Sequence, residues 1–242
     1  MSTYFEQEPY DLRCEWGPEG VRRLSPSSDA VIIVDIFSFT TAVDIAVSRG
    51  ARVYPFRWKD ERAATFAREK GALLAVSSRK DPQGLSLSPK SLLKLEPGSA
   101  IVLPSPNGAT LSLATDRTPT FAGCLRNASA VAKVAAALGP RITVIPAGER
   151  WEDGSLRPAL EDLLGAGAIL HALPGSRSPD AELAVAAFLR FRERLLETLA
   201  DCGSGREAAD RGSAEDVRLA AAWDSSRAAP RLLDEAYQNA AG

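Results

Sequence analysis

The sequence predicts an α/β fold: a three-layer α/β/α arrangement around a mixed or mostly parallel sheet, with a helical C-terminal third. Through the first 170 residues, short runs rich in branched and aromatic side chains alternate with stretches of helical pattern. Such alternation is typical of sheets covered by helices on both faces. Beyond residue 158 the pattern is almost wholly helical. The one long polar connector falls at 202–216. Because no comparable connector appears earlier in the chain, we expect a single domain over residues 1–242 with a substantial core.

The individual elements follow from these patterns. Strands are predicted at residues 30–35, 51–56, 72–76, 100–103, 119–122 and 141–146. Helices are predicted at 39–49, 59–70, 108–115 and 128–138, then at 158–172, 180–200 and 213–223, with a polar connector over 202–216. Polar residues, Gly or Pro follow each short strand, so the loops gather at the carboxyl ends of the strands, where open α/β sheets bind ligands.

Composition and charge narrow the classes of function. The chain has 29 Lys and Arg against 31 Asp and Glu, with no long run of either sign, so it lacks the basic surface that binds nucleic acid. It begins without a signal-like segment and contains no apolar run of about 18 residues, so we expect a cytoplasmic protein without a membrane partner. Cys14, Cys124 and Cys202 show no spacing of a disulfide framework or zinc site. The Ala-rich helices at 180–200 and 213–223 are compatible with a homodimer.

The stretch "VIIVDIFSFTTAV" (31–43) ends an apolar strand on Asp35. A carboxylate at that position faces the ligand crevice and can serve as a metal ligand, a general base or a nucleophile. The alternative is an acid that only caps the next helix. Haloacid-dehalogenase phosphatases require a second acid two residues later, where this chain has Phe37, so that family is excluded.

Three further segments carry candidate site residues. In "LPSPNGATLSLA" (103–114), Asn107 and Gly108 predict a tight turn before a helix, where backbone N–H groups can hold an anion, although the turn could be a simple connection. Glu161 and Asp162 open a later helix, a position that the helix dipole also favours. Arg126 and Asn127 stand at the start of an Ala-rich helix. The glycines and alanines at 165–168 predict close packing of their helix.

Taken in order, these segments resemble the 2-phosphosulfolactate phosphatase family, which is magnesium-dependent and associated with coenzyme M biosynthesis. The family's Asp-x-x-Arg-x-Thr-Thr is similar to residues 35–41, and its Thr-Thr-Asn-Gly-Thr turn to "SPNGAT" (105–110). Its Asn-Ala-Ser-Ala-Val helix start is similar to 127–131, and its Glu-Asp-x-x-x-Ala-Gly-Ala to "EDLLGAGA" (161–168). Ser38 replaces the motif arginine, which removes a bidentate cation suited to phosphate or sulfonate.

The resemblance implies a phosphatase of a small phosphomonoester, such as 2-phosphosulfolactate or a related phosphorylated acid. Mg²⁺ would be held by Asp35 with Glu161 or Asp162. Either Arg126 or Arg157 would stabilise charge on the leaving oxygen, and Arg79 and Arg150 are the other candidate replacements for the missing arginine. The substrate-binding set that the resemblance implies is Ser38, Thr40, Thr41, Asn107, Gly108, Thr110 and Asn127.

Two other functions remain compatible with the sequence. The first is a diverged, non-catalytic protein that binds small anions on the same fold, which the loss of the motif arginine would favour. The second is an enzyme of different chemistry on a phosphorylated or carboxylated acid. The sequence also leaves open whether Asp35 attacks phosphorus or only helps to activate water.

Overall fold

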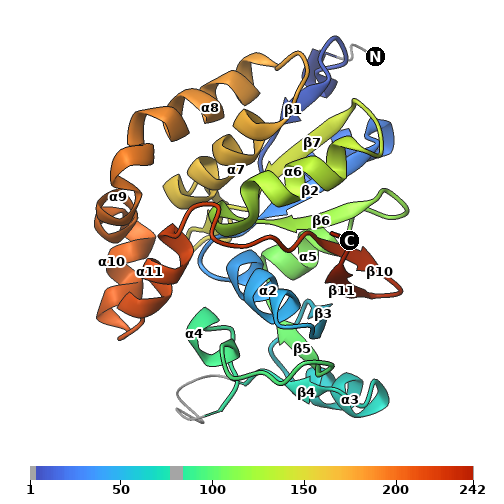
Figure 1. Cartoon of the computed structure of the whole chain (residues 1–242), viewed down its shortest axis with the longest axis vertical. Coiled ribbons are helices and arrows are strands. Elements are labelled where there is room, and N and C mark those ends of the chain that lie inside the picture. The colour runs from blue at the N-terminus through green and yellow to red at the C-terminus, as the bar shows by residue number, and fades with distance from the viewer. Residues whose placement is uncertain (1–3, 77–83, 242) are drawn as a thin grey trace.

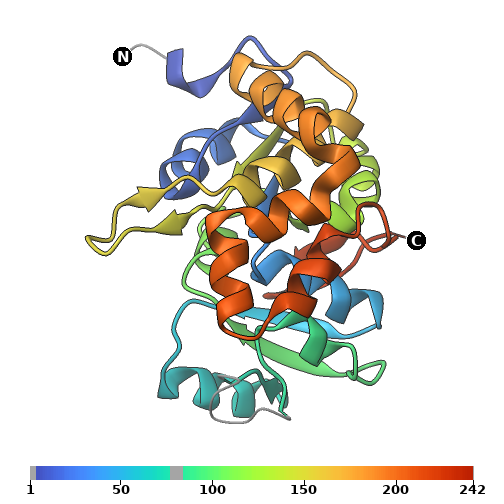
Figure 2. The same ribbon diagram turned by 90° about the vertical axis from the view of Figure 1, so that its left-hand side faces the viewer.

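The computed structural model describes residues 4–76 and 84–241, and a nine-stranded sheet runs through them (Figure 1). Its order is β1-β7-β2-β6-β10-β11-β3-β5-β4. The strands are β1 Leu12–Cys14, β2 Ala30–Val34, β3 Arg52–Phe56, β4 Leu73–Leu74, β5 Ala100–Pro104, β6 Thr120–Gly123, β7 Ile142–Pro146, β10 Pro230–Leu233 and β11 Ala236–Asn239. A separate hairpin pairs β8 Glu149–Arg150 with β9 Leu156–Arg157, and Figure 2 shows it in yellow, projecting from the body.

The helices cover both faces of the sheet, as the sequence predicts for an α/β fold. They are α1 Gly17–Leu24, α2 Phe39–Ser48, α3 Glu61–Glu69, α4 Pro89–Leu92, α5 Gly108–Ser112, α6 Ala128–Ala136, α7 Leu160–Ala172, α8 Pro179–Phe191, α9 Leu195–Asp201, α10 Gly203–Asp210 and α11 Ala214–Ala221. All six predicted strands and all seven predicted helical segments are present, with ends shifted by a few residues and the 180–200 segment divided between α8 and α9.

Strand β2 shows why the chain folds into three layers. Ile32 and Val34 lie in a core cluster with residues of α6, α7 and α8. Val31 and Ile33 lie in a different cluster with residues of α1 and α5. Because successive side chains of a strand point to opposite faces, a strand buried on both sides needs an unbroken apolar run.

The glycines of α7 allow the close packing that the sequence predicts. A Cβ on Gly167 would lie 2.0 Å from the carbonyl oxygen of Ala184 on α8. A Cβ on Gly165 would lie 2.6 Å from Cδ1 of Ile36, which follows β2. The helix therefore approaches both α8 and the end of β2 at distances that only glycine permits, which brings its first turn to the edge of the sheet.

Two parts of the C-terminal third differ from the prediction. Residues 202–216 are not a connector throughout, because Gly203–Asp210 form α10 and α11 begins at Ala214. After α11, β10 and β11 form an antiparallel hairpin in the middle of the sheet, between β6 and β3. The hairpin joins two parallel blocks of strands, β1-β7-β2-β6 and β3-β5-β4.

Among the described residues, no helix combines the length and apolar character needed to cross a membrane. The three thiols are free: Cys14 and Cys124 are buried, and Cys202 is half-buried.

Candidate functional site

The site begins where β2 ends, at Asp35. Its carboxylate is buried and accepts two backbone hydrogen bonds, from the N–H of Gly108 at 2.7 Å and from that of Phe39 at 3.3 Å. A Cβ on Gly108 would lie 2.7 Å from Oδ2 of Asp35 and 2.3 Å from the ring of Phe39. Glycine at position 108 is therefore required for the turn before α5 to reach the carboxylate.

The threonine pair fixes the loop between β2 and α2. The Thr40 hydroxyl donates to the carbonyl oxygen of Asp35 at 2.9 Å and accepts from the N–H of the same residue at 3.0 Å. The Thr41 hydroxyl donates to the carbonyl oxygen of Ile36 at 2.9 Å. Both threonines are fully buried, so these hydroxyls bind the backbone of the loop that carries Asp35.

Asp162, in the first turn of α7, joins two loops at the edge of the sheet. Its carboxylate accepts from the N–H of Ile36, after β2, and from the N–H of Gly148, after β7, both at 2.8 Å. The neighbouring Glu161 is also buried, and its Oε2 accepts from the Cys202 thiol at 3.6 Å. The acids that open α7 thus meet the loop that contains Asp35.

Glu149 completes the group of acids. It lies in β8, directly after the loop that follows β7, and its Oε2 accepts from the side-chain amide of Asn107 at 3.0 Å. This hydrogen bond links the Asn107–Gly108 turn to the β8–β9 hairpin, and the charges of Asp35 and Glu161 act on Glu149. We call Asp35, Glu149, Glu161 and Asp162 the acid cluster.

In the acid cluster, burial and neighbouring negative charges raise the pKa of three carboxyl groups. Burial raises the pKa of Asp35 to about 6, with a contribution from the charge of Glu161, while the N–H groups of Gly108 and Phe39 oppose the shift. Burial and the charges of Asp35 and Glu161 raise the pKa of Glu149 to about 7. The pKa of Asp162 also rises, through burial and the same two charges. The negative charges of Asp35 and Glu161 disfavour ionisation of neighbouring carboxyl groups, so a cation would stabilise the group.

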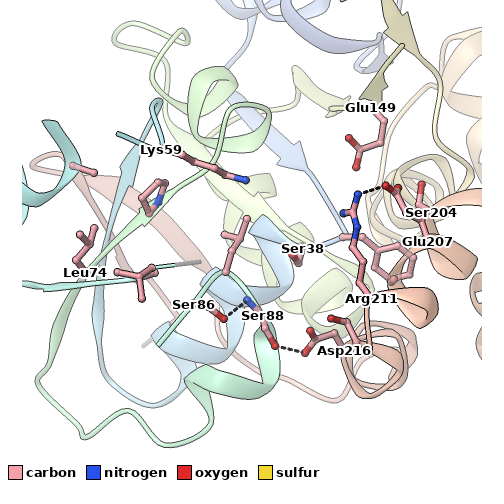
Figure 3. A pocket seen from close by; sticks show the side chains of 18 of the residues that line it. Ser38, Lys59, Leu74, Ser86, Ser88, Glu149, Ser204, Glu207, Arg211 and Asp216 are labelled. Carbon is pink, nitrogen blue, oxygen red and sulfur yellow. Dashed lines mark hydrogen bonds and ion pairs between the residues drawn. The ribbon is translucent and has the colours of Figure 1, made fainter. Parts of the chain in front are cut away.

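A cavity of about 930 Å³ opens beside the acid cluster (Figure 3). Ser38 and Lys59 line it from the sheet side, and Glu149 lines it from the hairpin. Ser204, Glu207 and Arg211 of α10 and the following turn, together with Asp216 of α11, form part of the opposite wall. A smaller cavity next to it is lined by Asn107, Thr110, Gly148, Glu149 and Arg150, among others.

The family model described as 2-phosphosulpholactate phosphatase matches residues 18–235. The chain belongs to the 2-phosphosulfolactate phosphatase family. It is 32% identical over 162 residues to the 2-phosphosulfolactate phosphatase of Methanothermobacter thermautotrophicus, an alignment that covers 66% of this chain and 68% of the relative. Enzymes of this family hydrolyse phosphomonoesters.

The structure separates the predicted site residues of this family member into two groups. Asp35, Asn107, Gly108, Glu161 and Asp162 converge at the carboxyl ends of β2 and β7, with Ser38 and Thr110 on the neighbouring cavity walls. Thr40, Thr41 and Asn127 are fully buried. The Asn127 side chain accepts from the N–H of Cys124 at 2.8 Å and donates to the carbonyl oxygen of Ala122. Both of these hydrogen bonds therefore go to the backbone that precedes α6.

The candidate arginines also lie in different surroundings. The Arg126 guanidinium forms an ion pair with buried Asp44 at 2.8 Å, and the residue is absent from both cavity linings. Arg157 donates to the hydroxyl of Ser204 at 3.1 Å, and its charge lowers the pKa of Glu149. Arg150 donates to the carbonyl oxygen of Gly154 within the exposed hairpin. Arg79 lies outside the described residues.

The acid cluster can be tested as a site for Mg²⁺. Over 4–76 and 84–241, no group of three or more His, Cys, Asp or Glu side chains is placed so that it could hold a metal ion. Mg²⁺, however, commonly takes one or two carboxylates and completes its shell with waters and substrate oxygens. The donors present are hard oxygens whose mutual repulsion a divalent cation relieves. The chemistry of the site therefore fits Mg²⁺.

Three residues at the site were not expected from the sequence: Glu149, Lys59 and Arg211. Glu149 stands three residues beyond the end of β7, close to the carboxyl end of a predicted strand as Asp35 is, so the signal was present. Lys59 lies between β3 and α3, and Arg211 follows α10. Neither stands in a motif, and they reach the cavity only through the tertiary fold.

Proposed function

We propose that this chain is a Mg²⁺-dependent phosphatase of a small phosphomonoester, 2-phosphosulfolactate or a related phosphorylated acid. The observation that carries the proposal is the acid cluster, four carboxylates gathered beside a cavity in a member of a phosphatase family. The named relative supports 2-phosphosulfolactate as the first substrate to test, and with it a place in coenzyme M biosynthesis.

In this proposal the acid cluster holds the ion, which would neutralise charge on the phosphoryl oxygens. Asp35 is one ligand. Glu161 is favoured over Asp162 as the second, because the Asp162 carboxylate already accepts two backbone N–H groups at 2.8 Å, whereas Glu161 accepts only a long contact from a thiol. Asp162 then fixes the two loops around the site.

The remaining residues bind and orient the substrate. The amide of Asn107 and the hydroxyl of Thr110, which line the smaller cavity together with Glu149, would donate to phosphoryl oxygens. Gly108 acts through its N–H, which positions the Asp35 carboxylate. Arg157 is the arginine whose field reaches the acid cluster, so we assign it the stabilisation of the leaving oxygen. Asp35 acts either as the nucleophile or in activating water.

The test is phosphate release from 2-phosphosulfolactate, measured with Mg²⁺ and with EDTA. We expect turnover in Mg²⁺ only, and a loss of roughly 10³-fold or more in kcat for Asp35→Asn, since a group that touches the reacting atoms is removed. Asp201→Asn is the control, because Asp201 pairs with Arg206 on the surface. Full activity of Asp35→Asn, with an unchanged circular dichroism spectrum, would contradict the proposal.

The non-catalytic alternative predicts a different result. A protein that only binds anions would release no phosphate, yet its melting temperature would rise with 2-phosphosulfolactate. No specific observation in the structure favours this alternative over the phosphatase.

A further inference from the structure

Lys59 is a cationic side chain in the cavity lining that has no ion-pair partner among the described residues. It follows β3 and lines the cavity together with Ser38 and Glu149. Figure 3 shows its side chain extending inward, with the ammonium group toward the middle of the cavity. It makes no hydrogen bond or ion pair with any residue in the part of the chain that the structure describes. Its charge is therefore not neutralised within the fold.

Two other cations near the cavity each contact a side chain of the fold. Arg211 pairs with Glu207, one turn away on the same wall. Arg157 donates to the Ser204 hydroxyl and lies over the ring of Trp151, 5.7 Å from its centroid. The acid nearest to Lys59 in sequence, Asp60, is held by Arg62 at 2.5 Å. Of the described cations that line the cavity, Arg211 is therefore paired with an acid and Lys59 is not. An anion that enters the cavity can bind to the Lys59 ammonium group without breaking an ion pair.

Lys59 also lies close enough to Asp35 to act on its carboxylate. Its field reaches the buried carboxylate of Asp35, where it favours the ionised form against the effect of burial on the pKa. Lys59 itself is exposed and lines the open cavity, whereas Asp35 does not line it. A ligand whose phosphoryl group is held at the acid cluster and whose remaining atoms enter the cavity would therefore reach Lys59.

We propose that Lys59 binds the second acidic group of the substrate, the one that is not transferred, and so selects phosphorylated acids over neutral phosphomonoesters. The assignment rests on the proposed phosphatase function and names a specificity-determining residue for it. An ammonium group on a flexible stem accepts carboxylate or sulfonate oxygens without a fixed geometry. Ser38 beside it offers only a hydroxyl, so the charge recognition depends on Lys59.

The test compares two esters with the same skeleton. 2-Phospholactate carries a carboxylate where isopropyl phosphate carries a methyl group. For the wild type we expect a higher kcat/KM with 2-phospholactate. Lys59→Met should lower kcat/KM for 2-phospholactate by about 10- to 100-fold, the value of a charge-assisted hydrogen bond, and leave isopropyl phosphate within about 3-fold. Lys59→Arg should retain the preference. Lys133→Met, at an exposed position of α6, is the matched control.

Several results would overturn the assignment. If Lys59→Met slows both esters equally, the lysine acts on the phosphoryl group, and if it slows neither, it does not bind substrate. If the wild type hydrolyses neither ester nor 2-phosphosulfolactate, the proposed function fails, and the assignment is judged by calorimetric binding of the two esters in Mg²⁺. Tighter binding of 2-phospholactate that is lost in Lys59→Met supports it. Equal or absent binding contradicts it.

Discussion

Asp35 and Asp44 are two buried acids at opposite ends of one short segment, and the fold treats them differently. Asp44, within α2, forms an ion pair with Arg126 at 2.8 Å and accepts from the hydroxyl of Ser226 at 2.6 Å. Asp35, just before the same helix, accepts only backbone N–H groups and faces further acids. One carboxylate is neutralised by a cation of the chain, and the other is oriented but not neutralised.

The difference separates a structural acid from a functional one. Burial raises the pKa of Asp44, and Ser226 and Arg126 oppose the shift. For Asp35 the groups that oppose the shift are two backbone N–H groups and the charge of Lys59, while the charge of Glu161 adds to the shift. A buried ion pair keeps its acid ionised within the fold, whereas an uncompensated cluster gains stability from a cation supplied by solvent.

The largest expected effect on stability comes from breaking the neutralised site. Arg126→Met leaves Asp44 buried without its cation, so we expect the free energy of unfolding to fall by about 3–5 kcal/mol. The turnover of the remaining folded enzyme should stay within about 3-fold of wild type, since Arg126 lines neither cavity. Urea denaturation and phosphate release at 20 °C measure the two quantities.

Two variants control this comparison. Arg206→Met removes an exposed ion pair with Asp201 and should cost at most about 1 kcal/mol. Asp44→Asn combined with Arg126→Met removes both charges of the buried pair and should recover part of the loss. Unchanged stability of Arg126→Met would contradict the structural role of the ion pair, and a collapse of kcat without a loss of stability would place Arg126 in the catalytic site.

A smaller effect of opposite sign is expected in the acid cluster. Because burial raises the folded-state pKa of Glu149 from 4.5 to about 7, the folded protein binds that proton more tightly than the unfolded chain does. The stability that the proton gives is present below about pH 4.5 and is lost as the pH rises through about 7. Glu149→Gln should therefore stabilise the protein at pH 8 by on the order of 1–3 kcal/mol, with little effect at pH 4.5.

Urea denaturation in EDTA at the two pH values measures this gain. Glu152→Gln, at an exposed position of the same hairpin, should be neutral at both. A destabilised Glu149→Gln at pH 8 would show that the hydrogen bond from Asn107, at 3.0 Å, outweighs the repulsion among the acids.

Much of the fold could be predicted because local patterns carry it. The run Ala30–Val34 is apolar on both faces and lies between helices, so its pattern and its burial agree. The C-terminal hairpin could not be predicted in the same way. Pro230–Leu233 and Ala236–Asn239 are short, and they gain their place by pairing with β6 and β3, strands remote in sequence. The α10 segment, rich in glycine and charge, is likewise a weak helix former that is held by packing.

The candidate site could be predicted in part, for a related reason. Asp35 and the pair Glu161 and Asp162 follow a strand or open a helix, so the rules of α/β sheets bring them to one edge. Thr40 and Arg126 lie close to that edge in sequence, yet their side chains point to backbone and to Asp44. Lys59 follows a strand of the other parallel block, and only the completed fold brings it into the same cavity lining as Ser38.

The central claim is that the acid cluster binds a divalent cation through Asp35, and titration of Mg²⁺ into the protein at pH 8 tests it most directly. Calorimetry and the melting temperature should report binding to the wild type and to Asp44→Asn, and none to Asp35→Asn. An Asp35→Asn variant that binds Mg²⁺ with the affinity of the wild type would contradict the account.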